Sequence, residues 1–267
     1  APTNVKDYSA YVNPFIGTGG HGHTFPGAVV PHGMIQPSPD TRIDGWDACS
    51  GYYYADSTIN GFSHTHVSGT GCCDYGDVLL MPTVGKQQYR TTDPQSQRLA
   101  YASSFSHKNE IAEPGYYSVF LDTYQVKAEI SSTKRGAIHR YTFPENAESG
   151  FIIDLDYSLQ RQTNSEMEIE VISDTEICGH KKTTYWAFDQ YINFYAKFSK
   201  PFYLRQTFSS FFAYFSFSNF QYQIFFRTLV LFLCPVYDRF LVNYTPTYLF
   251  CYYIVEQHRR KPKIYRI

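Results

Sequence analysis

The chain has 267 residues, of which 43% are hydrophobic, 18% aromatic and 18% charged, and its formal net charge is -1. A chain of this length can bury a sizeable core and holds one large or two ordinary domains. A net charge so close to zero gives no basic field for nucleic acid. The sequence contains no run of about 18 uncharged apolar residues, which argues against a membrane-spanning helix.

The first 200 or so residues alternate turn signals with short amphipathic segments. Turn signals include "GTGGHGH", "PSPD", "EPG" and "PENAESG", and the segments between them include "GYYSVFLDTY", "VKAEISS", "AIHRYTFP", "GFIIDLDY" and "EMEIEVIS". Alternation of polar and apolar residues is typical of strands with one wet and one dry face. We therefore predict an all-β, antiparallel β-sandwich over residues 1–201, in which roughly the first 90 residues form long functional loops.

The composition changes near residue 201. All 17 glycines lie at or before Gly179, and beyond residue 201 the sequence is crowded with Phe and Tyr and has only two acidic residues, Asp238 and Glu256. Phe, Tyr, Leu, Ile, Ser and Lys dominate when AT-rich coding DNA is translated out of frame. We predict that residues 202–267 are such an out-of-frame tail, with no function and a tendency to aggregate. A hydrophobic second domain and a membrane-surface segment are the alternatives.

The two chain features that bear on the cellular compartment are the first residue and the cysteines. The chain starts at Ala1 rather than methionine, as expected if a leader peptide has been removed. The six cysteines, at positions 49, 72, 73, 178, 234 and 251, are too unevenly spaced for a disulfide scaffold. A bridge from Cys49 to Cys72 or Cys73 is possible in an oxidising compartment, but free buried thiols are the simpler interpretation.

Four polar stretches are candidates for chemistry. They contribute, in chain order, His21, His23 and His32; Trp46 and Asp47; His64, His66, Asp74 and Asp77; and His107 and Glu110. A zinc site at His64 and His66 is disfavoured because the adjacent cysteines 72 and 73 point to opposite sides of an extended chain and the usual Cys-x2-Cys spacing is absent. "SGTG" is not the Gly-x-Ser-x-Gly elbow of hydrolases, and no Lys follows "GTGGHGH" as a phosphate loop requires.

Carbohydrate binding fits these residue types better. A sugar has an apolar face and a rim of hydroxyls, so an aromatic platform ringed by Asp, His, Asn and Arg holds it well. Trp46, with Asp44 and Asp47 beside it and histidine-rich loops elsewhere, supplies these groups.

Five motifs in a fixed order carry a family resemblance. "YVNPFIGTGGHGHTFPGAVVPHGMIQPSPDT", "GWDACSGYYY", "INGFSHTHVSGTGCCDYGDVLLMP", "FSHKNEIAEPGYYSVFLD" and "KRGAIHRYTFP" together resemble the N-terminal domain of glycoside hydrolase family 92, the calcium-dependent exo-acting α-mannosidases. The resemblance runs from about Tyr11 to Phe202. It implies a β-sandwich joined, in the whole enzyme, to a C-terminal (α/α)6 barrel that this chain lacks.

The resemblance also implies how function is divided between the two domains. The family inverts the anomeric centre, and its acid, its base and most or all of its calcium-binding side chains belong to the barrel. We therefore expect this chain alone to be inactive, with no catalytic residue, no metal ligand and no bound calcium. Its expected partners are a mannose-containing glycan, as in N-glycan degradation, and the missing catalytic domain. The expected location is secreted or periplasmic.

Within that framework the sandwich supplies one wall of the substrate cleft. The expected substrate-binding residues are Trp46, Asp47, His21, His23, His64 and His66, with the last two either bonding sugar hydroxyls or bracing the neighbouring loop. Asp74 and Asp77 are expected to stabilise turns. The side facing the barrel is expected to be apolar. The alternative function is a stand-alone carbohydrate-binding module.

Overall fold

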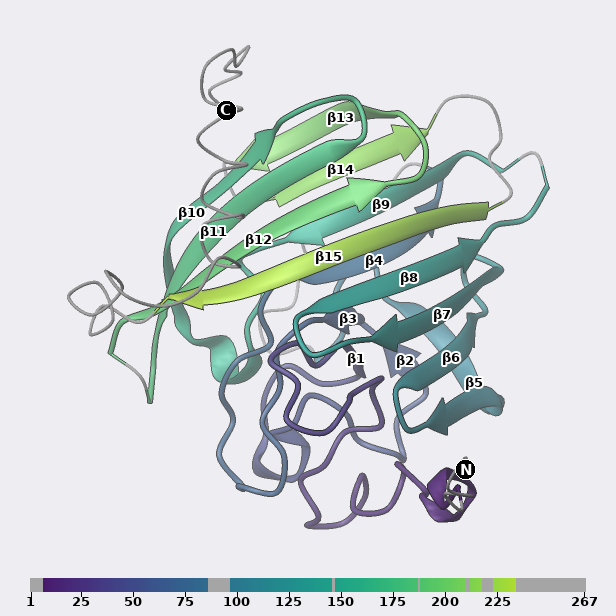
Figure 1. The fold of residues 1–267 in the computed structure, drawn as a ribbon, viewed down its shortest axis with the longest axis vertical. Coiled ribbons are helices and arrows are strands. Elements are labelled where there is room, and N and C mark those ends of the chain that lie inside the picture. Colours follow the sequence, from purple (N-terminus) through teal and green to yellow (C-terminus); the bar gives the residue numbers. More distant parts are fainter. Residues whose placement is uncertain are drawn as a thin grey trace, which may run out of the picture.

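The computed structural model describes residues 7–85, 97–145, 147–186, 188–209, 212–217 and 223–233, with no side-chain description for 161, 205–209, 212 and 223–233. In this part of the chain, antiparallel strands form two sheets, which confirms the all-β prediction (Figure 1). The six-stranded sheet has the order β1-β3-β4-β9-β14-β13, and the nine-stranded sheet has the order β10-β11-β12-β15-β8-β7-β6-β5-β2.

The strands are short near the N-terminus and longer after residue 100. They are β1 (Ser38–Asp40), β2 (Thr58–Ile59), β3 (Gly61–Ser63), β4 (Leu79–Val84), β5 (Ser103–Glu113), β6 (Tyr116–Leu121), β7 (Val126–Ser132), β8 (Gly136–Thr142), β9 (Ser149–Asp154), β10 (Thr163–Val171), β11 (Glu176–Thr184), β12 (Gln190–Phe198), β13 (Phe202–Ser209), β14 (Phe212–Phe217) and β15 (Gln223–Leu233). Three single-turn 3-10 helices are η1 (Ser9–Tyr11), η2 (Trp46–Ala48) and η3 (Leu159–Arg161). No helix in the described ranges is long and apolar enough to cross a membrane.

The alternation in the sequence determines which face of each strand is buried. In β12, Ile192, Phe194 and Ala196 are buried, whereas Asn193 and Tyr195 between them are partly exposed. Strand β9 is buried along its whole length because it lies at the centre of its sheet, between β4 and β14. All five segments that the sequence marks as strands are strands in the structure, β6 to β10.

The structure differs from the predicted division at residue 201. Strand β14 pairs with β9, and the side chains of Phe202, Phe215 and Phe217 are buried in the core. Phe202 packs against Phe215 with ring centroids 4.8 Å apart. The aromatic residues at the start of the tail therefore complete the sandwich, because alternating Phe side chains fit its dry face as well as any strand does.

The backbone of β15 lies between β12 and β8 in the nine-stranded sheet. The tail thus contributes three strands to the two sheets. The origin of residues 202–267 in another reading frame stays a prediction, and residues 234–267 lie outside the described ranges.

Most of the chain between residues 7 and 78 is loop, and it lies below the sheets in the view of Figure 1. These loops hold most of the polar residues that the sequence singles out, whereas His107 and Glu110 lie in β5.

Candidate functional site

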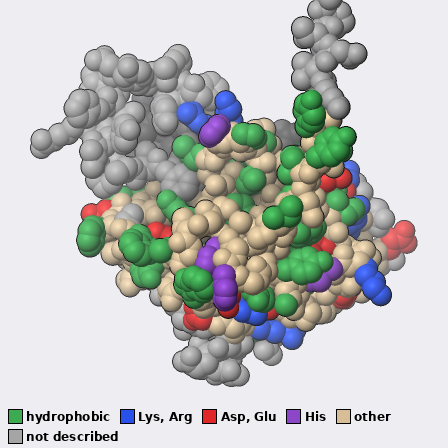
Figure 2. Space-filling model, turned by 90° about the horizontal axis from the view of Figure 1, so that it is seen from below, with side chains coloured by type: hydrophobic (Ala, Val, Ile, Leu, Met, Phe, Trp, Pro, Cys, Tyr) green, Lys and Arg blue, Asp and Glu red, His purple; other side chains and the backbone are tan. Residues whose placement is uncertain are grey.

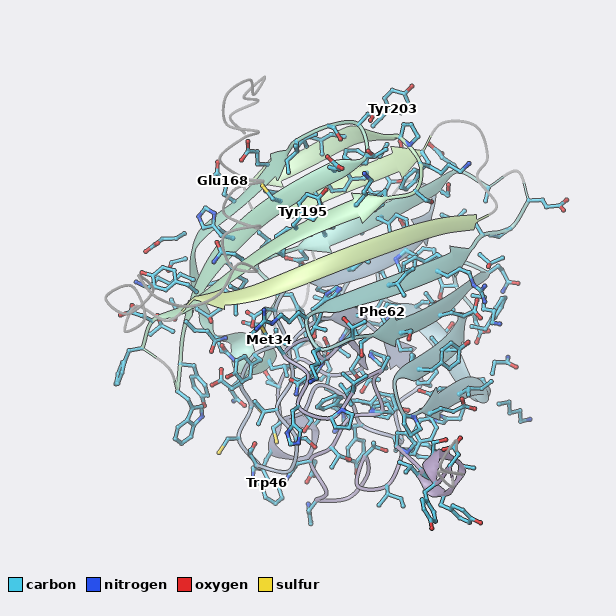
Figure 3. All side chains as sticks on the ribbon, in the orientation of Figure 1. Met34, Trp46, Phe62, Glu168, Tyr195 and Tyr203 are labelled. Atoms are coloured by element: carbon cyan, nitrogen blue, oxygen red, sulfur yellow. The ribbon has the colours of Figure 1, made fainter. Side chains whose placement is uncertain are left out.

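Two of the predicted loops meet at the lower end of the molecule, where Figure 3 labels Trp46. The Trp46 indole is 57% exposed, and the rings of His21 and His23 lie 5.0 and 4.3 Å from it, centroid to centroid. His21 Nδ1 is 2.5 Å from Asp47 Oδ1, and both side chains are open to solvent. Four of the six predicted substrate-binding residues are thus one cluster, which we call the Trp46 cluster: His21, His23, Trp46 and Asp47.

The backbone holds this cluster in place through His23. This residue has a left-handed φ of 55°, which is uncommon for a side chain with a Cβ. Its carbonyl accepts hydrogen bonds from Ser50 Oγ at 2.5 Å and from the Gly69 amide at 2.6 Å. The histidine loop, the chain after η2 and the "SGTG" loop are therefore tied together at one carbonyl.

The Gly71 backbone packs against the rings of His23 and Trp46. A Cβ at this position would lie 3.2 Å from His23 Cε1 and 3.3 Å from Trp46 Nε1, and its φ of 64° is in the left-handed region. Only glycine gives both rings room to pack against the backbone there. This is the role of one glycine in the "SGTG" motif.

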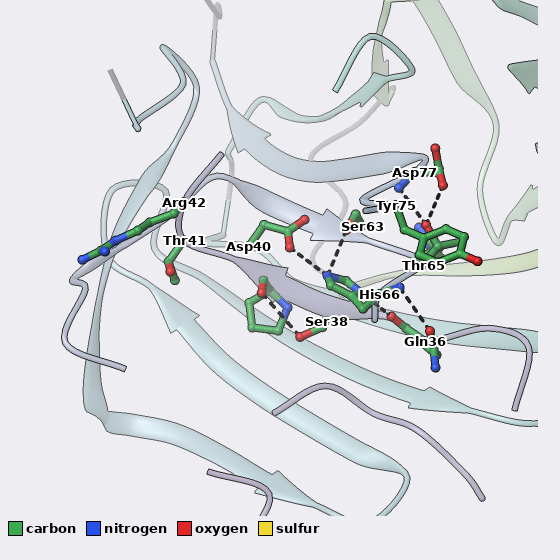
Figure 4. Close-up of polar contacts among 12 residues, drawn as sticks. Gln36, Ser38, Asp40, Thr41, Arg42, Ser63, Thr65, His66, Tyr75 and Asp77 are labelled. Carbon is green, nitrogen blue, oxygen red and sulfur yellow. Dashed lines mark hydrogen bonds and ion pairs between the residues drawn. The ribbon is translucent and has the colours of Figure 1, made fainter. Parts of the chain in front are cut away.

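His64 and His66 lie elsewhere, in the interior, with exposed fractions of 0% and 2%. His66 Nε2 is 2.8 Å from Asp40 Oδ1 and 3.1 Å from Ser63 Oγ, and Nδ1 is 2.7 Å from the Gln36 carbonyl (Figure 4). Both ring nitrogens of His66 face oxygen atoms. In this structure neither His64 nor His66 reaches the surface, so their contacts match the bracing role and not direct sugar contact.

The grouping of Ser63, His66 and Asp40 is not a catalytic triad. In a triad the acid binds one ring nitrogen and the nucleophile the other. Here Asp40 and Ser63 both contact Nε2, and the side chains of His66 and Asp40 are fully buried. Ser63, His66 and Asp40 therefore form a buried group of contacts within the fold.

His64 is held as a neutral ring. Its Nδ1 donates to the Val78 carbonyl at 2.7 Å, and its ring lies 5.0 Å from that of His139. Burial lowers the pKa of His64 to about 4, a shift that the hydrogen bond to Val78 opposes in part. Burial also lowers the pKa of His139 well below its usual range. Neither ring carries a charge near neutral pH.

Asp77 belongs to a buried ion pair that the sequence did not predict. Its Oδ1 lies 3.0 Å from Lys181 Nζ, and both side chains are fully buried. Thr65 Oγ1 donates to Asp77 Oδ2 at 2.8 Å and Gln190 Nε2 donates to it at 3.3 Å, so β11 and β12 are tied to the 64–78 loop. The expectation of a simple turn role is wrong for Asp77, whereas Asp74 Oδ1 does accept the next amide, Tyr75 N, at 2.8 Å. Lys181 was detectable in principle, because it takes an inward position in the alternation of β11.

The buried Glu110 side chain and the partly exposed His107 belong to a second group of polar contacts. Glu110 accepts hydrogen bonds from Tyr117 at 2.6 Å and from Tyr52 at 3.0 Å, and His107 Nδ1 lies 2.6 Å from its Oε2. The His107 ring stacks on Tyr54 with centroids 4.2 Å apart. These contacts use the hydrogen-bonding capacity of the carboxylate inside the protein, which indicates a structural role.

The described cysteines, 49, 72, 73 and 178, form no disulfide with one another. Burial raises the pKa of the Cys73 thiol to about 12, so it is protonated near neutral pH. Cys234 and Cys251 lie outside the described residues.

Calcium does not fit the groups found in the described ranges. They contain no cluster of three or more His, Cys, Asp or Glu side chains that could hold a metal ion. The buried carboxylates already have partners: Asp40 pairs with His66, Asp77 with Lys181, and Glu129 with Arg140. The Trp46 cluster offers imidazoles and one carboxylate, whereas calcium prefers six to eight oxygens. The Trp46 cluster is therefore a poor match for a calcium ion.

On this two-sheet β domain, an exposed indole lies beside His and Asp side chains, which together offer an apolar face and hydrogen-bonding groups suited to a sugar. The model of the glycosyl hydrolase family 92 N-terminal domain matches residues 11–220, and the chain belongs to this family. The match extends beyond Phe202, through strands β13 and β14.

Solved structures of the family agree with this assignment. An α-mannosidase of family GH92 from Bacteroides thetaiotaomicron, in complex with mannoimidazole, is 35% identical, with a TM-score of 0.76 over 84% of this chain and 32% of that chain. An inverting mannosidase of the family from Bacteroides thetaiotaomicron is 25% identical, with a TM-score of 0.68 over 97% of this chain and 36% of that one. An uncharacterized secreted glycosidase from Arthroderma benhamiae is 32% identical over 143 residues, which are 52% of this chain and 18% of that protein. The chain thus spans about a third or less of the length of these relatives.

Proposed function

We propose that this chain is the substrate-binding, non-catalytic N-terminal part of an inverting α-mannosidase that removes terminal α-mannose from glycans. The observation that carries the proposal is the Trp46 cluster, an exposed indole with an Asp and two His side chains around it. The indole face suits the apolar face of a pyranose, and Asp47 and His21 suit its hydroxyls. In a whole enzyme this surface forms one wall of the cleft, opposite the domain that holds the acid and the base.

His64 and His66 have an indirect part in this proposal. They support the 61–78 loop from within, and that loop presents Gly71 to the Trp46 cluster. Their substitution is expected to disturb sugar binding only by disturbing the loop.

The catalytic acid and base lie outside this chain in our proposal. An inverting pair stands about 6.5–9.5 Å apart with room for a water between its members. Asp40, Asp77 and Glu110 are buried and already bonded to other side chains. Asp47 is exposed but pairs with His21. We expect no release of mannose by this chain with or without calcium, and detectable calcium-dependent release would refute the proposal.

Several large apolar side chains on the described surface support a contact with a further domain. They are Tyr8, Tyr11, Ile16 and Tyr54 near the N-terminus and Tyr185, Trp186 and Phe188 around the β11–β12 turn. Seen from the loop end, hydrophobic side chains occur in several groups, with histidines against some of them (Figure 2). Covering them with a partner domain would remove their cost in water. The secreted relative supports a secreted location for the protein.

A titration with mannobiose tests sugar binding directly. We expect amide and indole NMR shifts near Trp46 with a dissociation constant of about 1 mM, worth about 4 kcal/mol, because half a cleft buries little of the ligand. Trp46→Ala is expected to abolish these shifts, and Trp186→Ala serves as the matched control because Trp186 is also an exposed tryptophan. Absence of shifts near Trp46 at high ligand concentration would contradict the proposal for this surface.

A stand-alone carbohydrate-binding module is the second candidate. It is favoured by the same observation, since the Trp46 cluster is already assembled without another domain. The titration separates the two candidates by affinity. Half a cleft is expected to give a dissociation constant of about 1 mM at best, whereas a stand-alone module needs one well below 1 mM.

A further inference from the structure

The Trp46 cluster contains one polar atom that its contacts do not explain. His23 is only 8% exposed, and its Nε2 is buried with no hydrogen-bond partner among the described residues. Buried ring nitrogens are nearly always bonded, because a polar atom taken out of water without a partner costs free energy. An unbonded nitrogen inside an exposed cluster therefore points to a partner that is missing from this conformation.

The His23 side chain is not the part that can easily move. Its carbonyl is held by Ser50 and Gly69, and its left-handed φ restricts its backbone further. The ring packs on the Gly71 backbone, where a Cβ would come within 3.3 Å of its Nδ1. The imidazole is thus presented from a fixed base.

The Trp46 indole is the exposed neighbour of the His23 ring. It packs edge to face on His23, with an interplanar angle of 77°, and more than half of its surface is in water. Beside it, Gly45 has a φ of 108° and nothing lies within 4 Å of the place where its Cβ would be. The backbone position next to Trp46 is therefore uncrowded, and the contacts of the indole in the cluster are with the rings of His21 and His23 and with Gly71.

We propose that Trp46 is a lid over His23 and that His23 Nε2 is a concealed hydrogen-bonding group, uncovered when the indole turns to stack on a pyranose. Sugar binding would then place an aromatic face and a ring nitrogen on the same pyranose at the same time. His21 contributes to the resting position of the lid, because its ring, paired with Asp47 at 2.5 Å, lies 5.0 Å from the indole, centroid to centroid. The contact between His23 Nε2 and a sugar rests on the proposed function, but the concealment of His23 does not.

Site-resolved modification of histidines by diethylpyrocarbonate, read by mass spectrometry, tests the lid without any sugar. The folded chain carries its own standards, since His21 is 73% exposed at its side chain and His64 is fully buried. We expect His23 to react far more slowly than His21 in the unchanged protein. Trp46→Ala is expected to raise the His23 rate severalfold, toward that of His21, and to leave His64 unreactive.

Two controls keep the result interpretable. Trp186→Ala removes an equally exposed indole from another loop and is expected to leave the His23 rate unchanged. Trp46→Phe keeps a smaller ring over His23 and is expected to give an intermediate rate. If His23 reacts as fast as His21 in the unchanged protein, or stays slow in Trp46→Ala while His64 is still protected, the lid is refuted.

Repeating the histidine modification with mannobiose at saturating concentration tests the second half of the proposal, the contact between the sugar and His23 Nε2. If the sugar occupies the uncovered nitrogen, Trp46→Ala loses binding, and His23→Ala weakens binding while the indole still reports the sugar by NMR. If Trp46→Ala uncovers His23 but mannobiose affects neither Trp46 nor His23, the concealment of His23 stands and the proposed sugar contact is refuted. A His23→Ala variant that binds mannobiose as well as the unchanged protein would refute the role of Nε2.

Discussion

The Trp46 cluster and the buried network around Asp77 use the same kinds of residue for opposite purposes. Each places a basic side chain beside a carboxylate from the glycine-rich loops of the first 80 residues: His21 beside Asp47 in the cluster, and Lys181 of β11 beside Asp77 in the network. In the cluster, His21 and Asp47 are open to water and their pair is cheap to break. In the network, Asp77 and Lys181 are fully buried and bonded to partners on several elements.

Burial thus separates function from support in this domain. A polar group in water is available to a ligand but adds little to stability, whereas a buried, bonded group adds specificity to the fold and is closed to a ligand. Variants in the two regions should therefore differ in which property they change.

Breaking the buried ion pair gives the largest expected loss of stability. Asp77→Ala leaves the Lys181 ammonium buried without its carboxylate, and the free energy of unfolding is expected to fall by about 3–5 kcal/mol. Urea unfolding followed by circular dichroism measures this. Lys182→Ala is the matched control, since Lys182 sits one residue further along β11 and pairs with the exposed Asp189, and it is expected to cost about 1 kcal/mol or less. Equal losses in the two variants would contradict the distinction.

The neutral buried histidine gives the next effect, through pH. His64 has its pKa lowered by burial to about 4 from the usual 6.5, so the unfolded chain takes up the proton first. Stability is fully present above pH 6.5 and is lost as the pH falls toward 4, by up to about 3 kcal/mol. His64→Asn, whose amide can replace the Nδ1 donor to Val78, is expected to flatten this part of the profile. His21→Asn, at an exposed position, is expected to leave it unchanged.

The pH dependence of stability that comes from Asp154 is expected to be opposite to that from His64. Burial raises its pKa to about 6 from the usual 3.8, although Tyr101 and two backbone amides donate to it. The folded state therefore holds the proton more tightly, and its contribution to stability is present below pH 3.8 and lost as the pH rises through 6. Asp154→Asn should remove this loss, so its unfolding free energy should fall less than that of the unchanged protein between pH 4 and 7. An identical slope in the two proteins over that range would show that Asp154 does not titrate there.

The contrast between the two regions also shows what the sequence could predict. Alternation located strands β6 to β10 and the five ordered motifs identified the family, because both depend on residues close together in the chain. The sequence placed His21 and Asp47, 26 residues apart, on the same wall of the cleft but did not predict that they pair. It also did not show that Trp46 is exposed beside them. "FSHTH" gave no signal that its histidines are buried, because their surroundings come from distant parts of the chain: His66 lies against Gln36 and Asp40, and His64 lies against His139. The strands after residue 201 were missed because their composition masked an ordinary alternation.

Replacing Trp46 is expected to have the smallest effect on stability and the largest on ligand binding. The indole is more than half exposed and lies outside the buried core, so Trp46→Ala should change the free energy of unfolding by about 0.5 kcal/mol or less. Removing the indole also lets water reach His23 Nε2, and hydrating this unbonded nitrogen offsets part of the loss in the free energy of unfolding. Urea unfolding and the mannobiose titration on the same preparation would measure both quantities. If Trp46→Ala instead destabilised the domain as much as Asp77→Ala does, Trp46 would be part of the support, and the separation of the two regions would fail at the residue on which it most depends.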